Sequence, residues 1–156
     1  MKIYTLSQRL FNQAMLNNKI TEENVEEKEK AFFISINNTE GVDKEYKNRQ
    51  YFKENKKNVL ILYFDDINED VNEDDLVAKA MDEIQALELL NFINNNKNKE
   101  TCIIHCSAGI SRSGAVGSFI CDYLKQDYEQ FKKDNPIIHP NSHVLSILKK
   151  ISGINY

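Results

Sequence analysis

The stretch that decides the fold is CIIHCSAGISRSG, residues 102–114. It begins with an apolar segment that is typical of a buried strand and that ends at His105. A loop of seven residues follows, from Cys106 to Arg112, and residues 112–125 then show the apolar periodicity of a helix. The sequence therefore predicts a tight loop between the carboxyl end of a strand and the N-terminus of a helix.

A loop in this position is a favourable place for an anion. The first backbone N–H groups of a helix have no partners inside the helix, and the helix dipole is positive at that end. Gly109 lets the backbone turn tightly, and Arg112 can donate two parallel hydrogen bonds to phosphate oxygens. Positive charge of this kind also stabilises a thiolate, so Cys106 is a candidate nucleophile. Ser113 can donate a hydrogen bond to its sulfur.

The rest of the chain predicts an α/β fold around this loop. Short apolar or β-branched runs predict four strands, at residues 2–6, 31–36, 59–64 and 102–105. Apolar periodicity predicts three helices and two weaker ones, at residues 75–93, 112–125 and 141–151, and at 7–17 and 21–30. We expect one α/β domain over residues 1–156, with a central, mainly parallel (mixed) sheet and helices on both of its faces.

The helix expected at 75–93 rests on a repeat of apolar residues at intervals of three and four. Asp74 or Asp75 is the expected N-cap. The residues expected on the buried face are Leu76, Ala80, Ile84, Leu87 and Leu90.

Composition and charge exclude several broad classes of protein. The net charge of −4 argues against a general nucleic-acid binder or a protein of anionic membrane surfaces. The sequence has no apolar run near the roughly 18 residues of a membrane span, and no secretory signal. Its three cysteines are an odd number without metal-ligand spacing, which argues against a disulfide framework. We expect a soluble protein of a reducing compartment, the cytoplasm.

The phrase His-Cys-x5-Arg-Ser resembles the signature of cysteine-dependent protein phosphatases, and HCSAGISRSG is similar to that of their dual-specificity subgroup. The resemblance covers about residues 59–151. It implies that Cys106 attacks phosphorus to form a phosphocysteine, that His105 helps to hold the thiolate, and that no metal or other cofactor is needed. It also implies a phosphate cradle formed by the loop residues Ser107, Ala108, Gly109, Ile110, Ser111 and Arg112.

A proton donor is also needed to expel the leaving group. The resemblance implies an aspartate after the preceding strand, and Asp66 fits the pattern better than Asp65. Asp66 lies 40 residues before Cys106, a longer gap than is usual in the subgroup, and residues 65–75 contain seven carboxylates. We interpret the extra length as an insertion whose acidic side chains mostly face solvent.

Other polar residues receive weaker assignments. Asn141 precedes the last predicted helix and is expected either to support the phosphate loop or to cap that helix. His139 and His143 lack further ligands for a metal site. Cys102 and Cys121 are expected to pack in the core rather than to act as redox partners of the nucleophile.

One motif is set aside. YKNRQY, residues 46–51, is similar to a phosphotyrosine-recognition motif of the larger tyrosine-specific phosphatases. We interpret its basic residues as a solvated face, because those domains are much longer and this chain has no Trp.

Several functions share the same loop chemistry. The expected substrate is a protein carrying phosphotyrosine, with phosphoserine and phosphothreonine as further candidates. A phosphoinositide phosphatase, an RNA 5′-phosphate phosphatase and a phosphopeptide-binding pseudophosphatase remain as alternatives. The uncharged side chains between Cys106 and Arg112 favour protein substrates, since lipid-directed relatives often carry lysines there. A nucleotide-binding P-loop is excluded by the absence of Gly-x4-Gly-Lys-Ser/Thr.

Overall fold

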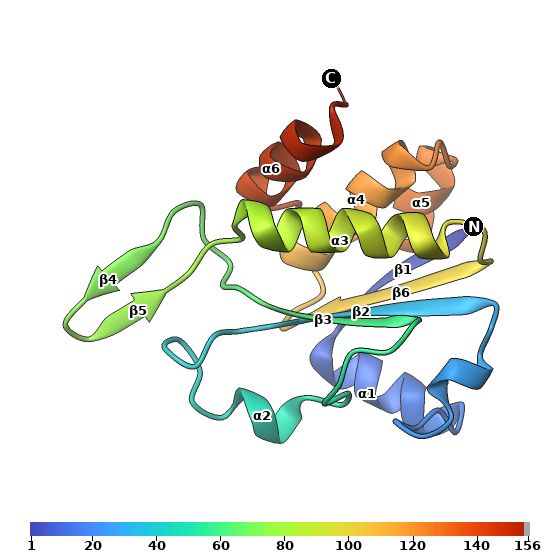
Figure 1. Ribbon diagram of the computed structural model, residues 1–156, viewed down its shortest axis with the longest axis horizontal. Helices are drawn as coiled ribbons and strands as arrows, with labels where there is room; N and C mark the ends of the chain where they lie inside the picture. The colour runs from blue at the N-terminus through green and yellow to red at the C-terminus, as the bar shows by residue number, and fades with distance from the viewer. Residues whose placement is uncertain (155–156) are drawn as a thin grey trace.

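The computed structural model describes residues 1–154, and its centre is a sheet of four parallel strands (Figure 1). The strand order is β1-β6-β2-β3, which places β6 inside the sheet. The strands are β1 (Lys2–Ser7), β2 (Ala31–Asn37), β3 (Val59–Tyr63) and β6 (Thr101–Cys106). All four predicted strands are present, and the expected mainly parallel sheet is confirmed. Antiparallel pairing of named strands occurs only in a separate two-stranded hairpin.

Helices cover both faces of the sheet, as Figure 1 shows. On one face lie α1 (Gln8–Asn17) and α2 (Tyr46–Arg49). The other face carries four helices: α3 (Glu83–Asn96), α4 (Arg112–Tyr123), α5 (Tyr128–Asp134) and α6 (Ser142–Ser152). The short α5 was not predicted. The weak helix expected at 21–30 is only a single 3-10 turn, η1 (Val25–Glu27).

Two hydrophobic cores follow from the alternation of side chains along the strands. In β2, Phe32 and Ile34 pack into the core under α3, α4 and α6, whereas Phe33 packs into the core under α1. Because both faces are covered, interior positions of both faces are apolar, and the predicted runs at 59–64 and 102–105 are nearly all apolar for this reason.

The helix expected at 75–93 is partly wrong. Residues 71–78 form an antiparallel hairpin, β4 (Val71–Glu73) and β5 (Leu76–Ala78), and the helix begins only at Glu83. Asp82 is its N-cap: the carboxylate accepts a hydrogen bond from the Gln85 N–H at 2.8 Å, and the Gln85 side chain accepts one from the Asp82 N–H. This capping box fixes the start of the helix.

The expected buried face of that helix is also only partly right: Ala80 is buried and Leu90 packs against the core, but Leu76, Ile84 and Leu87 are exposed. Ile84 is 78% exposed and Leu87 is 50% exposed. The face that packs on the sheet carries Ala86, Leu89, Phe92 and Ile93. Apolar residues lie around most of this helix, so periodicity alone did not identify the side that the sheet covers.

The hairpin accounts for the extra length between Asp66 and the signature loop. It projects from the body of the protein beside the carboxyl ends of the strands (Figure 1). Five of the seven carboxylates of residues 65–75 are exposed on or next to it: Glu69, Asp70, Glu73, Asp74 and Asp75. Within the described residues, no helix combines the length and the apolar character needed to cross a bilayer.

Candidate active site

The predicted loop lies where the sequence placed it, between the carboxyl end of β6 and the N-terminus of α4. Cys106 is the last residue of β6 and is 2% exposed. Its sulfur lies 3.2 Å from the hydroxyl oxygen of Ser113, in the first turn of α4. Because β6 pairs with β1 on one side and β2 on the other, the sulfur is held by an interior strand of the sheet.

The carbonyl groups of the loop are turned outward. The carbonyl of Ser107 accepts a hydrogen bond from the Gln8 N–H at 3.2 Å. The carbonyl of Ile110 accepts from the His139 N–H at 2.9 Å, and that of Ser111 from the Asn141 N–H at 3.0 Å. The N–H of a planar trans peptide points opposite to its carbonyl. The N–H groups that follow these carbonyls, at residues 108, 111 and 112, are therefore directed away from the three anchors.

Gly109 is the tightest point of the loop. Its φ is +74°, in the left-handed region that favours glycine. A Cβ at this position would lie 2.5 Å from both the carbonyl carbon of Leu6 and the backbone nitrogen of Ser7. The loop is thus packed directly against the junction of β1 and α1.

Arg112 is 4% exposed and bridges the loop to the neighbouring strand end. Its Nη1 donates to the carbonyl of Phe64 at 2.8 Å, and its Nη2 donates to the hydroxyl of Ser107 at 3.1 Å. Its Nε is buried, and no residue between 1 and 154 accepts a hydrogen bond from it. A buried donor without a partner is costly, so this guanidinium is held in place with one donor still available.

His105 lies behind the nucleophile, wholly buried between β2 and α1. Its Nδ1 donates to the carbonyl of Cys106 at 3.3 Å, which leaves Nε2 to accept a hydrogen bond from the Ser35 hydroxyl at 2.7 Å. Burial lowers the pKa of His105 to about 4; the hydrogen bond to the Cys106 carbonyl opposes this shift, and the nearby positive charge of Arg112 adds a smaller lowering effect. His105 is therefore neutral at pH 7.

This support continues into β2. The side-chain N–H of Asn37 donates to the Ser35 hydroxyl at 3.2 Å, so a chain of hydrogen bonds runs from Asn37 through Ser35 and His105 to Cys106. Sequence reasoning missed both Ser35 and Asn37. Their only signal was the presence of polar residues within an otherwise apolar strand.

The two candidate acids have different surroundings. Asp65 is 2% exposed, and its carboxylate accepts hydrogen bonds from the Thr39 N–H at 2.9 Å, the Thr39 hydroxyl at 2.5 Å and the Lys79 N–H at 2.8 Å. Asp66 is exposed at the rim of the signature loop. Its Oδ1 accepts from the Ser111 hydroxyl at 2.8 Å and from the side chain of Asn141 at 2.8 Å.

Asn141 has both of the roles that were considered for it. Its side-chain oxygen accepts a hydrogen bond from the Val144 N–H and caps α6, while its side-chain nitrogen contacts Asp66. Its backbone N–H also holds the carbonyl of Ser111. The histidines on either side have structural contacts: His143, for example, bonds to the carbonyl of Met81. Among the residues that the structure describes, no three His, Cys, Asp or Glu side chains are grouped as around a metal ion.

The other two cysteines are buried in the core. Burial raises the pKa of Cys102 well above its ordinary value and raises that of Cys121 to about 11. Both thiols are therefore protonated and unreactive near neutral pH.

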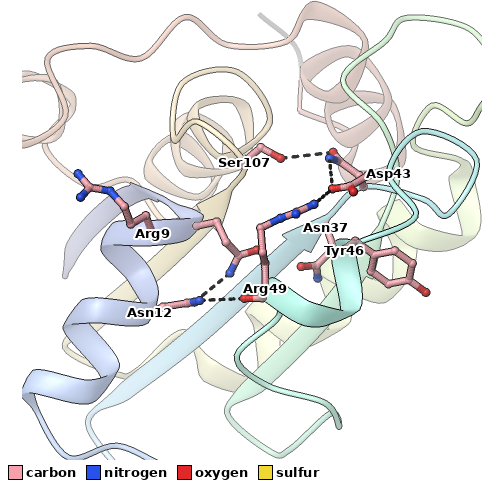
Figure 2. A pocket seen from close by; sticks show the side chains of 9 residues that line it. Arg9, Asn12, Asn37, Asp43, Tyr46, Arg49 and Ser107 are labelled. Atoms are coloured by element: carbon pink, nitrogen blue, oxygen red, sulfur yellow. Dashed lines mark hydrogen bonds and ion pairs between the residues drawn. The ribbon is translucent and has the colours of Figure 1, made fainter.

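A cavity of about 430 Å³ lies beside the loop, between α1 and α2 (Figure 2). Arg9, Tyr46, Arg49 and Ser107 are among the residues that line it. Of residues 46–51, Tyr46 and Arg49 line this cavity, and Arg49 is also exposed, as expected for a solvated basic residue. The guanidinium of Arg49 forms an ion pair with Asp43 and lowers the pKa of that carboxyl.

The sequence and the fold have known counterparts. A family model described as protein-tyrosine phosphatase matches residues 18–151. The solved phosphatase PTP-2 of Cydia pomonella is 17% identical, with a TM-score of 0.54 over 96% of this chain and 85% of its own. The human tyrosine phosphatase-like serine/threonine/tyrosine-interacting protein is 19% identical, with a TM-score of 0.48 over 83% and 82%. PTPMT1, solved with PI(5)P, is 14% identical, with a TM-score of 0.49 over 97% and 90%. No curated protein sequence matches significantly.

Proposed function

Because this chain belongs to the protein-tyrosine phosphatase family, we propose that it hydrolyses phosphotyrosine in proteins, with Cys106 as the nucleophile. The observation that carries the proposal is the meeting of three groups at one loop. The Cys106 sulfur and the buried guanidinium of Arg112 come from the two ends of the signature loop, and the carboxylate of Asp66 comes from the distant segment after β3. Phosphoserine and phosphothreonine are further candidate substrates.

In the first step, the thiolate of Cys106 attacks phosphorus as the bond to the leaving oxygen breaks. Asp66 donates a proton to that oxygen, so the product leaves as a neutral phenol or alcohol. The phosphoryl oxygens lie in the cradle of residues 107–112. The N–H groups turned inward and the free Nε of Arg112 bind these oxygens and stabilise the charge that develops on them.

In the second step, water attacks the phosphocysteine. Asp66, now a carboxylate, takes a proton from the water, and the bond between phosphorus and sulfur breaks. Ser113 donates a hydrogen bond to the departing sulfur, from which it lies 3.2 Å away in the resting site. Inorganic phosphate is released and the thiolate is restored. Each proton and bond exchange in this sequence involves only the substrate, water and groups of the chain, so the proposed reaction uses no metal ion.

The proposal is tested by comparing turnover on four substrates: phosphotyrosine peptide, phosphoserine and phosphothreonine peptides, phosphoinositide, and RNA with a 5′-triphosphate. We expect the phosphotyrosine peptide to be hydrolysed fastest, in the presence of chelator, and vanadate to inhibit. Cys106→Ser is the control and should be inactive although folded. Preferential hydrolysis of lipid or RNA would replace the proposed substrate, and an active Cys106→Ser protein would exclude the mechanism.

A further inference from the structure

We propose that the cavity between α1 and α2 binds a negatively charged group of the peptide substrate, next to the phosphorylated residue, and that Arg9 recognises it. The inference rests on the proposed function, and it specifies on which side of the phosphoryl site the acidic part of the peptide lies. The acidic flank of the peptide lies over α1 and α2 rather than over the β4–β5 hairpin. Carboxylate side chains and a second phosphoryl group share the chemistry that this site recognises.

The position of the cavity is the first argument. Ser107 belongs both to the cavity wall and to the signature loop, and its hydroxyl accepts a hydrogen bond from Arg112. A substrate whose phosphoryl group lies in the loop therefore extends its neighbouring groups across the cavity mouth. At about 430 Å³, the cavity can hold one or two side chains.

The charge of the cavity is the second argument. Arg49 is neutralised by its ion pair with Asp43. Arg9 is exposed and forms no ion pair with any residue that the structure describes. In Figure 2 its guanidinium points away from the Arg49–Asp43 pair and into solvent. An exposed arginine of this kind can turn over the cavity mouth without breaking an existing contact.

The cavity wall also contains an acceptor without a donor. Oδ1 of Asn37 is buried, and no residue from 1 to 154 donates a hydrogen bond to it. Its amide orientation is fixed, since Nδ2 faces the Ser35 and Leu62 carbonyls. A buried acceptor of this kind is costly when unpaired. Because this oxygen has almost no exposed surface, a peptide N–H beside the anionic group would reach it only if the Asn37 side chain moved toward the cavity.

The opposite side of the loop repels the same ligand. Asp66 and Ser111 mark the far end of the loop, and the hairpin beyond them exposes Glu73, Asp74 and Asp75. Acidic groups of the substrate are therefore attracted to one side of the phosphoryl site and repelled from the other. The chain thus distinguishes the two flanks of a phosphorylated residue by charge.

The test uses phosphotyrosine peptides with glutamates on the N-terminal side only, on the C-terminal side only, on both sides or on neither, and one peptide with a second phosphotyrosine. We expect glutamates on one side of the phosphotyrosine, but not on the other, to raise kcat/KM relative to the peptide without glutamates. The increase should be about threefold to fivefold at low salt and should disappear at high salt. Arg9→Gln should abolish the gain and Arg9→Glu should reverse it. Lys133→Gln removes the same charge from α5, on the opposite face, and should leave the gain intact.

The controls separate this inference from the function on which it rests. An aryl phosphate without flanking groups should be hydrolysed equally by wild type, Arg9→Gln and Lys133→Gln. Equal rates on acidic and neutral peptides, or an equal loss on all substrates in Arg9→Gln, would overturn the inference and leave the function standing. If no substrate is turned over, the function fails. Fluorescence anisotropy of the same peptides on Cys106→Ser then decides the inference: equal affinities reject it.

Discussion

Asp65 and Asp66 are neighbours in sequence, yet their carboxylates have opposite environments. Asp65 is buried and ties the base of the hairpin, at Lys79, to the loop after β2, at Thr39. Asp66 is exposed and held at the rim of the signature loop by Ser111 and Asn141. The first is a structural anchor, and the second is accessible to a ligand in the signature loop, as the proposed acid must be. The anchor positions its neighbour, because fixing Asp65 limits where the backbone of Asp66 can lie.

The loss of activity on replacing Asp66 should depend on the leaving group of the substrate. For Asp66→Asn we expect kcat to fall about 100-fold or more on phenyl phosphate, whose leaving group needs a proton, and far less on p-nitrophenyl phosphate. Steady-state kinetics on the two substrates measure the difference. Asp65→Asn is the matched control and should lower both rates by a similar factor, through displacement of the loop. If only Asp65→Asn discriminates between the substrates, the acid is Asp65.

Gly109→Ala should damage the loop. An added Cβ would lie 2.5 Å from backbone atoms of Leu6 and Ser7, so either the loop or β1 must move. We expect a loss of kcat/KM of at least tenfold on aryl phosphates. Gly153→Ala is the control, because its φ of +73° imposes the same backbone strain with no atom within 4 Å of the new Cβ. It should cost about 1 kcal/mol of unfolding free energy and no activity. Full activity of Gly109→Ala would contradict the packing described here.

The elements show which parts of the fold the sequence could predict. The four strands were identified because two covered faces require continuous apolar runs, and the signature loop because its residue types are chemically unusual. The start of α3 was missed because apolar residues from Leu76 onward continue the helical spacing through a hairpin. The pairing of Val71–Glu73 with Leu76–Ala78, which forms across a turn, distinguishes the two structures. The cavity was also unpredictable, since Arg9 and Arg49 are far apart in sequence and come to line one cavity only after folding.

The residue at which α3 begins can be tested by mutation of its N-cap. Asp82→Ala removes the carboxylate that accepts from the Gln85 N–H, and should lower the unfolding free energy by about 1 kcal/mol in urea titrations. Asp74→Ala, at the N-cap position suggested by sequence alone, should change it by less than about 0.5 kcal/mol, since Asp74 is exposed in the hairpin turn. The reverse order of effects would place the helix start in residues 74–75 after all.

For the whole molecule, His105 couples stability to pH. Its pKa is about 4 in the folded protein and near 6.5 when unfolded, so the unfolded chain binds the extra proton between these values. Stability attributable to His105 is complete above about pH 6.5 and is lost as the pH falls toward 4. One pKa unit corresponds to about 1.4 kcal/mol, so the loss should reach about 3 kcal/mol.

Urea titrations from pH 7 to pH 4 test this dependence, with His105→Gln as the control. The variant should be less stable at pH 7, because its hydrogen bonds to Ser35 and Cys106 are altered, but its stability should fall less steeply with acid. The difference between the stability–pH curves of wild type and His105→Gln gives the contribution of His105 separately from that of the carboxylates. Parallel curves would show that His105 is not the titrating group.

The pairing of β1 with β6 has a practical consequence for the choice of expression boundaries. The family match begins at residue 18, after β1 and α1. Yet β1 pairs with β6 from Lys2 to Ser7, and Gln8 holds the first carbonyl of the signature loop. An expression boundary drawn at the family match would keep every predicted catalytic residue and remove one wall of the loop. Truncations and N-terminal fusions should therefore retain the chain from Lys2 onward.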